Sequence, residues 1–268
     1  MKIQNNSSNS NLSLIFYKNY FKGIDFNNIE SESNQRIIMK NNERIINETG
    51  YINILNDIVS TPQKFEAKIT YPGLATGIGL VHEIGVEGEF KLGIHLDYTS
   101  GMPVIHGSSV KGLIRSVFPS KEKKASIKDA KRKNINGWLT DLGVKPVVSI
   151  DDLENQIFEG IVSGNHISVY DRDIFFDAVL SKPDYKGRVV VSDFITHHPD
   201  LLKAPNPVCF LKIAPGCKMC FRFDLKPFKR DGNILVTANQ KLELFKKIIG
   251  YFGVGAKTNV GYGQLRMT

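Results

Sequence analysis

Residues 218–253 read KMCFRFDLKPFKRDGNILVTANQKLELFKKIIGYFG, and this one stretch combines the two patterns that decide the fold. From 219 to 225 every second residue is apolar, which is typical of a strand with one buried and one solvated face. From 242 to 252 the apolar residues recur at helical spacing instead, and Gly253 follows where a helix commonly ends. The stretch therefore predicts a strand followed by an amphipathic helix.

The same two patterns continue outward along the rest of the chain. Strand-like alternation or apolar β runs occur at residues 65–71, 90–96, 189–191 and 207–213, and a last strand is expected at 260–266. A second amphipathic helix is expected after Gly107-Ser108-Ser109, because the apolar residues from 110 to 118 share one face and Pro119 stops it. This order predicts an α+β fold with a mainly antiparallel sheet, of the ferredoxin-like type.

The composition of the 268 residues excludes several classes of protein. Hydrophobic residues make up 41%, too many for a chain that is disordered throughout. No apolar run approaches the roughly 20 residues that a membrane span needs, and the start of the chain lacks the pattern of a secretory signal. The three cysteines are too few for a disulfide framework, so we expect a cytoplasmic protein with no membrane partner.

The net charge of +8 is spread unevenly along the chain. Residues 121–145 carry eight bases and three acids, residues 146–185 two bases and eight acids, and residues 186–268 carry 14 bases and five acids. A basic C-terminal third suits a polyanion such as nucleic acid, although a basic soluble surface explains the same counts.

The domain organisation follows from these changes in composition. Residues 1–62 are rich in asparagine and form an extension that we expect to be partly helical. Residues 63–268 form the α+β domain, with insertions near 119–145 and 151–184. The Lys-rich run at 121–133 and the acidic insertion are both expected to be exposed loops or small excursions rather than core.

The sequence HGSSVKGLIR at 106–115 is the first candidate for a binding site. A helix N-terminus offers free N–H groups and the positive end of the helix dipole to a phosphate, and Ser108 and Ser109 can donate to it as well. Lys111 and Arg115 are four residues apart and so share one helix face. A serine N-cap on an ordinary amphipathic helix with two solvated bases explains the same residues.

The C-terminal sequence GVGAKTNVGYG at 253–263 is the second candidate. It is not a nucleotide-hydrolysing P-loop, because Ala256 separates Gly255 from Lys257 and the loop follows a helix instead of a strand. A flexible backbone with Lys257 and Thr258 can still lie against phosphates or sugars. The competing interpretation is a tight helix-to-strand turn, which needs fewer glycines.

An earlier loop, PGLATGIGLVHE at 72–83, is a weaker candidate. Gly77 gives its backbone freedom, and His82 can act as a general acid or base or stack on a nucleobase. A lone histidine in a loop is more often a polar surface residue. Cys217 and Cys220 make a single CxxC without a second pair, so we expect no metal and no cofactor.

Five ordered blocks from about Leu74 to the C-terminus resemble the RAMP superfamily of CRISPR effector proteins. The blocks are GLATGIG, IHLDYTSGMPVIHGSSVKGLIR, FFDAVL with DFITHHP, APNPVCFLKIAPG and FGVGAKTNVGYGQL. The Gly-Ser-Ser block and the glycine-rich loop mark the superfamily, and the remaining blocks are most similar to subunit six of type III-B Cmr complexes. His106 departs from the pattern, since the superfamily usually has proline before Gly-Ser-Ser.

The resemblance implies a modified ferredoxin-like (RRM-like) RAMP fold and a non-catalytic subunit that binds guide RNA (crRNA) in an antiviral ribonucleoprotein. Such a subunit caps the backbone of the complex near the 3′ part of the guide. The implied partners are crRNA, target RNA, the backbone RAMP, the small helical subunit, the head RAMP and the polymerase-like large subunit. The RNA-binding residues that the resemblance implies are Ser108, Ser109, Lys111, Arg115, Gly255, Lys257, Thr258, Gly77 and His82.

Two other functions stay open at this level. A guide-processing RAMP endoribonuclease would use His82 as acid or base and the glycine-rich loop to hold the phosphate. A scaffold would touch proteins more than RNA, through residues 1–60 and 151–184. Target cleavage is not expected, because the backbone subunit cleaves with a loop aspartate, and in residues 74–83 the only acid is Glu83.

Overall fold

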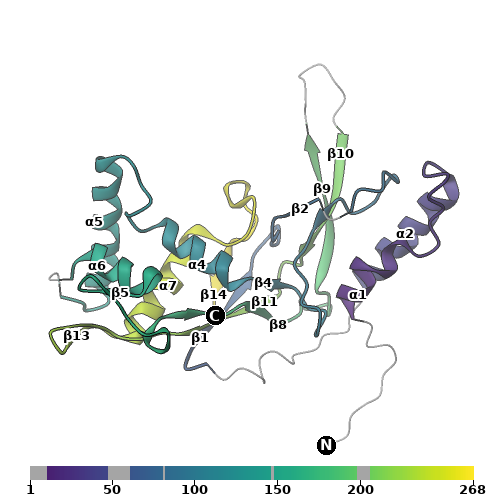
Figure 1. Ribbon diagram of the computed structural model, residues 1–268. Helices are drawn as coiled ribbons and strands as arrows, with labels where there is room; N and C mark the ends of the chain where they lie inside the picture. Colours follow the sequence, from purple (N-terminus) through teal and green to yellow (C-terminus); the bar gives the residue numbers. More distant parts are fainter. Residues whose placement is uncertain (1–10, 48–60, 81, 146–147, 198–205) are drawn as a thin grey trace, which may run out of the picture.

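The computed structural model describes residues 11–47, 61–80, 82–145, 148–197 and 206–268. Parts of the extension 1–62 therefore lie outside the described residues. Figure 1 shows a main sheet with helices on one side, a second sheet standing beside it, and the N-terminal helices at the far end. The mixture of helices and antiparallel sheet confirms the predicted α+β class.

The main sheet has six strands in the part of the chain that the structure describes, and its pairings are antiparallel. Its strands in spatial order are β14 (Leu265–Met267), β1 (Gln63–Ile69), β11 (Lys218–Asp224), β8 (Ala178–Lys182) and β4 (Val104–Ile105), with β7 (Ile174–Phe175) also paired to β11. The alternation in β1 and β11 buries Ala67 and Phe221 and turns Lys68 and Lys218 to the opposite face.

Helices gather on one side of this sheet (Figure 1). They are α4 (Gly107–Ser116), α5 (Ala125–Asp141), α6 (Ile150–Glu154), the adjoining turn η2 (Asn155–Glu159) and α7 (Ala238–Phe252). Thr237 and Gln240 form a capping box at the start of α7, which satisfies backbone N–H groups that a helix start leaves free. Phe245 of α7 packs on Phe223 of β11 and on Phe175, with ring centroids 5.5 and 5.6 Å apart. These contacts fix the point where the glycine-rich loop leaves α7.

A buried ion pair joins α7 to the segment that precedes β7. Lys241 Nζ lies 2.6 Å from Asp173 Oδ2, and both side chains are fully buried. Burial lowers the pKa of Lys241 and raises the pKa of Asp173, while the attraction between the two opposes both shifts. Lys241 also donates to Gln156, and the N–H of Lys226 donates to Asp173. Each charge thus meets its opposite and one further hydrogen bond in the core, and removal of either would leave the other charge buried without its ion-pair partner.

A second sheet carries the long hairpin that rises at the top of Figure 1. Its strands in order are β2 (Ile78–Leu80), β3 (Leu92–Gly93), β10 (Asn206–Ile213) and β9 (Val190–His197). The extension forms α1 (Leu12–Tyr17), η1 (Asn19–Phe21) and α2 (Glu32–Asn47), which confirms its helical content. Tyr20 is fully buried, and its hydroxyl accepts a hydrogen bond from the N–H of Phe90 at 3.0 Å. The extension is therefore part of the core around this sheet.

Short elements complete the fold. They are the hairpins β5 (Ile161–Val162) with β6 (Asn165–His166) and β12 (Phe228–Arg230) with β13 (Asn233–Val236), and the turns η3 (Val169–Asp171) and η4 (Thr258–Val260). Within the described ranges, no helix is long and apolar enough to cross a membrane.

The two insertions differ from the expectation that they are exposed loops. Most of the Lys-rich run lies in α5, which forms because Ile135 and Leu139, four residues apart, bury one face among the other helices. The acidic insertion places Ile157 and Phe158 in the core and supplies β8, an inner strand of the main sheet. Both runs are therefore integral to the domain.

Two strand predictions were too long. The strand expected at 90–96 is reduced to β3, with a single further bridge between Leu96 and Pro103. The last strand begins at Leu265 rather than at 260, because residues 258–260 form the turn η4.

Candidate nucleic-acid interface

The two glycine-bearing loops that the sequence singled out pack against each other. A Cβ added to Gly77 would lie 2.7 Å from the Cβ of Ala256, and one added to Gly255 would lie 2.2 Å from the carbonyl oxygen of Ala75. The N–H of Ala256 donates to that same carbonyl at 2.8 Å. Both glycines therefore allow the backbones of the two loops to approach each other closely. They shape the loop pair, and their direct contact with RNA stays a prediction.

The loop pair presents Lys257 to solvent. Its backbone is left-handed, with φ at 60° and ψ at 31°, and its side chain is exposed. No acid in the described ranges pairs with it. Thr258 follows as the half-buried first residue of η4. A cation held out by a tightly packed loop is well placed to meet an anionic ligand.

The first turn of α4 already holds an internal carboxylate. The N–H of Gly107 donates to Asp177 Oδ1 at 2.7 Å, and His106 Nδ1 lies 3.4 Å from Asp177 Oδ2. The N-cap residue is His106, so the interpretation of a serine N-cap is wrong. Ser108 and Ser109 are exposed on the outer side of this turn. A phosphate at the helix start would lie beside Asp177, and the serine contacts stay a prediction.

A chain of contacts links this helix start to the loop pair. His106 Nε2 lies 3.1 Å from His95 Nδ1, and the N–H of His95 donates to Thr76 Oγ1 at 3.1 Å. Thr76 directly precedes Gly77, which packs on Ala256. The structure thus brings the three candidate segments into one region. Sequence reasoning missed His95 and noticed His106 only as a departure from a family pattern.

The two bases of α4 are engaged within the protein. Lys111 Nζ donates to the carbonyl oxygen of Phe158 at 3.0 Å and lies 5.7 Å from the ring centroid of Phe175. Arg115 forms an ion pair with Glu159 and lies 5.7 Å from the ring of Phe158. Both bases hold η2 against α4. They would have to exchange these partners to contact RNA.

His82 is buried, with a relative exposure of 2%, where the sequence favours an open loop residue. Its ring centroid lies 4.3, 4.5 and 4.7 Å from those of Phe16, Tyr20 and Phe21. Neither ring nitrogen has a hydrogen-bond partner among the described residues, and burial lowers its pKa to about 4. The interpretation as a polar surface residue is wrong. An enclosed, neutral imidazole does not reach an RNA base or a scissile phosphate in this conformation.

The face of the main sheet opposite the helices carries a row of bases that sequence reasoning missed. Arg266 of β14 pairs with Lys68 of β1, Lys68 pairs with Lys218 of β11, and Lys218 pairs with Lys182 of β8. Residues paired across strands lie on the same face. Arg266, Lys68 and Lys182 are exposed, and Lys218 is partly exposed. We call these four residues the cationic row.

The cationic row has little acid beside it. Lys218 Nζ lies 3.7 Å from Glu66 Oε2, and the other three bases have no ion pair in the described part of the chain. Like charges directly opposite one another destabilise a sheet. Because strands are about 4.8 Å apart, the row extends over roughly 14 Å. A linear polyanion that lies across the strands would relieve this repulsion.

Comparison with protein families defines the class of protein. The model of the RAMP superfamily matches residues 66–266, most of the chain. The chain therefore belongs to the RAMP superfamily, as its sequence blocks indicate.

Two solved structures are similar to this chain. A chain of the cryo-EM structure of the type III-B Cmr-beta bound to cognate target RNA has a TM-score of 0.56 and 21% identity, over 97% of this chain and 91% of that chain. The crystal structure of Cmr6 from Pyrococcus furiosus has a TM-score of 0.43 and 19% identity, over 79% of this chain and 100% of that chain. No curated protein sequence matches the chain. The first likeness shows the RAMP fold.

Proposed function

We propose that this chain is a non-catalytic subunit that binds guide RNA (crRNA) in a type III-B CRISPR interference complex. The observation that carries the proposal is the cationic row, four bases in register across four strands with one acid beside them. A polyphosphate backbone supplies the complementary line of negative charge. Membership of the RAMP superfamily supports RNA as that polyanion.

The chemistry of this surface favours binding without base readout. Lysine and arginine contacts to phosphate position a nucleic acid and carry no sequence information. We therefore expect the row and Lys257 to hold guides of any sequence with strongly salt-dependent affinity. A subunit that serves many different guides needs this tolerance.

The place in the complex belongs to the same proposal. The similarity of the sequence blocks to subunit six supports a cap on the backbone near the 3′ part of the guide. The proposed protein partners are the backbone RAMP, the small helical subunit, the head RAMP and the polymerase-like large subunit. The likeness to a chain of a Cmr structure bound to target RNA supports such an assembly.

The experiment is purification of the tagged chain from cells that express its neighbouring genes, followed by sequencing of the RNA that co-purifies. The expected result is discrete RNAs that share one 5′ repeat-derived tag, together with several other subunits. A chain that elutes alone and without RNA would contradict the proposal.

Guide processing is the second candidate, and it rests on a histidine pair other than His82. His106 and His95 lie 3.1 Å apart, and Asp177 orients His106. Burial, together with the neighbouring His106, lowers the pKa of His95, which favours a neutral base beside a second imidazole. Repeat-containing RNA incubated without metal would then give defined products with the wild type and with the exposed-histidine control His166→Ala. His106→Ala would give none. Absence of products with the wild type would exclude this candidate.

A further inference from the structure

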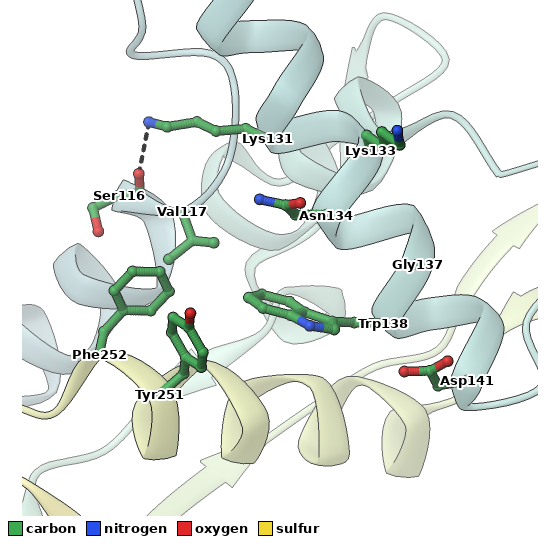
Figure 2. A pocket seen from close by; sticks show the side chains of 10 residues that line it. All are labelled: Ser116, Val117, Lys131, Lys133, Asn134, Gly137, Trp138, Asp141, Tyr251 and Phe252. Atoms are coloured by element: carbon green, nitrogen blue, oxygen red, sulfur yellow. Dashed lines mark hydrogen bonds between the residues drawn. The ribbon is translucent and has the colours of Figure 1, made fainter.

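An aromatic pocket lies between the ends of α4 and α7 and one side of α5 (Figure 2). Its volume is about 550 Å³. Pockets of roughly 300–1,000 Å³ accept small organic groups. None of the residues assigned above to the cationic row, the glycine loops or the start of α4 lines it.

One wall of the pocket is aromatic. Tyr251 is 74% exposed and Phe252 is 40% exposed, although both belong to the last turn of a helix whose other face is core. The rings of Trp138 and Tyr251 have centroids 6.3 Å apart and planes tilted by 55°. Large exposed rings gathered in one concave place are typical of a binding site rather than of packing.

The other side of the pocket is polar and basic. Figure 2 shows Asn134 and Lys131 on α5, the same helix as Trp138, across the cavity from Tyr251 and Phe252 of α7. Lys131 Nζ donates to the carbonyl oxygen of Ser116 at 2.8 Å and lies 3.7 Å from Glu122 Oε2, with which it forms an ion pair. Lys133 is exposed and has no ion pair among the described residues. The acid in the lining, Asp141, is neutralised by an ion pair outside the pocket. Lys133 is therefore the one charged side chain of the described lining that has no ion pair.

We infer that this pocket binds one nucleobase of a single-stranded RNA, stacked on the indole of Trp138. Single-stranded nucleic acid is held by aromatic platforms combined with cations that meet the backbone, and this pocket combines both. An amide such as that of Asn134 can hydrogen-bond a base edge. An aliphatic side chain of a protein partner would use the rings but neither the amide nor Lys133.

The position of the pocket fits an RNA that is bound elsewhere on the chain. Phe252 lines the pocket and is followed at once by Gly253, the first residue of the loop that carries Lys257. The loop that carries Lys257 thus begins at the wall of the pocket, so we expect a strand held at Lys257 to be able to reach it. This inference rests on the proposed function for the RNA itself, but the base site can be tested with a nucleotide alone.

Trp138 is the only tryptophan of the chain, so its fluorescence reports on this pocket directly. The purified full chain is titrated with adenosine monophosphate, with ribose 5-phosphate and with a short single-stranded oligoadenylate. We expect adenosine monophosphate and the oligoadenylate to quench the fluorescence saturably. Ribose 5-phosphate, which has no base, should not quench it. Absence of quenching by both base-containing probes would overturn the inference.

The decisive variant is Tyr251→Ala, which removes an exposed ring and leaves the core intact. Loss of one stacking partner should weaken adenosine monophosphate about tenfold. The matched control is Tyr170→Ala, which removes a ring that is 88% exposed in η3, outside the pocket lining. Equal affinity of wild type and Tyr251→Ala would overturn the inference.

Filter retention of the labelled oligoadenylate separates this inference from the proposed function. Retention without quenching overturns the base pocket and supports RNA binding. Quenching by adenosine monophosphate without retention of the oligonucleotide supports the pocket and contradicts the proposed function. A Tyr251→Ala chain that binds both probes like the wild type but fails to join the complex assigns the pocket to a protein partner, which also overturns the inference.

Discussion

Lys68 of β1 stands directly opposite Lys218 of β11, and the same register places Arg266 beside the first and Lys182 beside the second. Folding alone does not favour this arrangement, since like charges opposite each other on one sheet face repel. Glu66 lies near Lys218 only. The row is better explained by what binds to it than by what it adds to the fold.

The repulsion within the row predicts a stability gain on removal of a charge. Lys68→Gln should raise the free energy of unfolding by about 0.5 kcal/mol at low ionic strength. The gain should fade at high salt, where the charges are screened. Lys229→Gln is the control, because that exposed strand lysine faces Ile234 rather than a base. Urea unfolding of both variants at two salt concentrations measures the difference, and an unchanged or lowered stability of Lys68→Gln would contradict the account.

Substitutions of Lys257 and Lys111 are predicted to have different effects, the first on RNA binding and the second on stability. Lys257→Ala should weaken RNA binding and leave the unfolding free energy unchanged, because the side chain has no partner in the described ranges. Lys111→Ala should lower the unfolding free energy by about 1 kcal/mol, since it loses the bond to Phe158 and the ring of Phe175. Filter binding and thermal unfolding on both variants provide the test. Equal stability losses would show that the two lysines are not placed as described.

The burial of the His82 imidazole predicts that the free energy of unfolding depends on pH. Unfolded His82 takes up a proton near its ordinary pKa of 6.5, whereas the folded side chain does so only near 4. The stability that comes from keeping His82 neutral is therefore fully present above about pH 6.5. As the pH falls from there to about 4, the free energy of unfolding decreases by about 3 kcal/mol. His82→Phe keeps an aromatic ring beside Tyr20 and removes the titration. Unfolding free energies measured across this range should fall less steeply for the variant, and parallel curves would contradict the burial of a neutral imidazole.

The buried pair of Lys241 and Asp173 predicts a strongly coupled double mutant. Lys241→Met should lower the unfolding free energy by about 3–5 kcal/mol, because Asp173 is left charged and unpaired in the core. Lys241→Met with Asp173→Leu should recover much of that loss, since no lone charge remains. Urea unfolding of the two single variants and the double variant measures the coupling. Additive losses would indicate that the two side chains are not paired.

The sequence predicted those helices and strands whose apolar pattern lies within one segment. The alternation in β1 identifies its wet and buried faces, because the strand has one of each. In β11 the expected solvated face is wrong, since Cys220 and Arg222 are also buried and Cys220 packs with Val104 and Val179. Helix α5 escaped prediction because a Lys-rich segment with only two fully buried apolar side chains, Ile135 and Leu139, looks like a solvated loop.

The site was only partly predictable, because its decisive features are not local. The cationic row joins residues from four strands that are far apart in the sequence, and only the register brings Lys68 next to Lys218. The aromatic ring cluster around His82 comes from the N-terminal extension, so the neighbours of His82 in the sequence say nothing about its burial. The exposed Lys257 on a glycine-rich loop was found, because glycine spacing and charge are visible in a single segment.

The most direct test of the account is the salt dependence of RNA binding by a chain without the row. The variant is Lys68→Gln, Lys182→Gln, Lys218→Gln and Arg266→Gln combined. The control, with the same change in net charge at exposed sites elsewhere, is Lys22→Gln, Lys40→Gln, Lys121→Gln and Lys229→Gln combined.

Retention of a labelled single-stranded RNA is measured on filters over a series of salt concentrations. The account predicts that the row variant binds much more weakly and that its slope of log affinity against log salt is smaller by about three, at roughly 0.7 per lost phosphate contact. The control should keep nearly the wild-type slope. A row variant with the affinity and slope of the wild type would contradict the claim that this face of the sheet binds RNA.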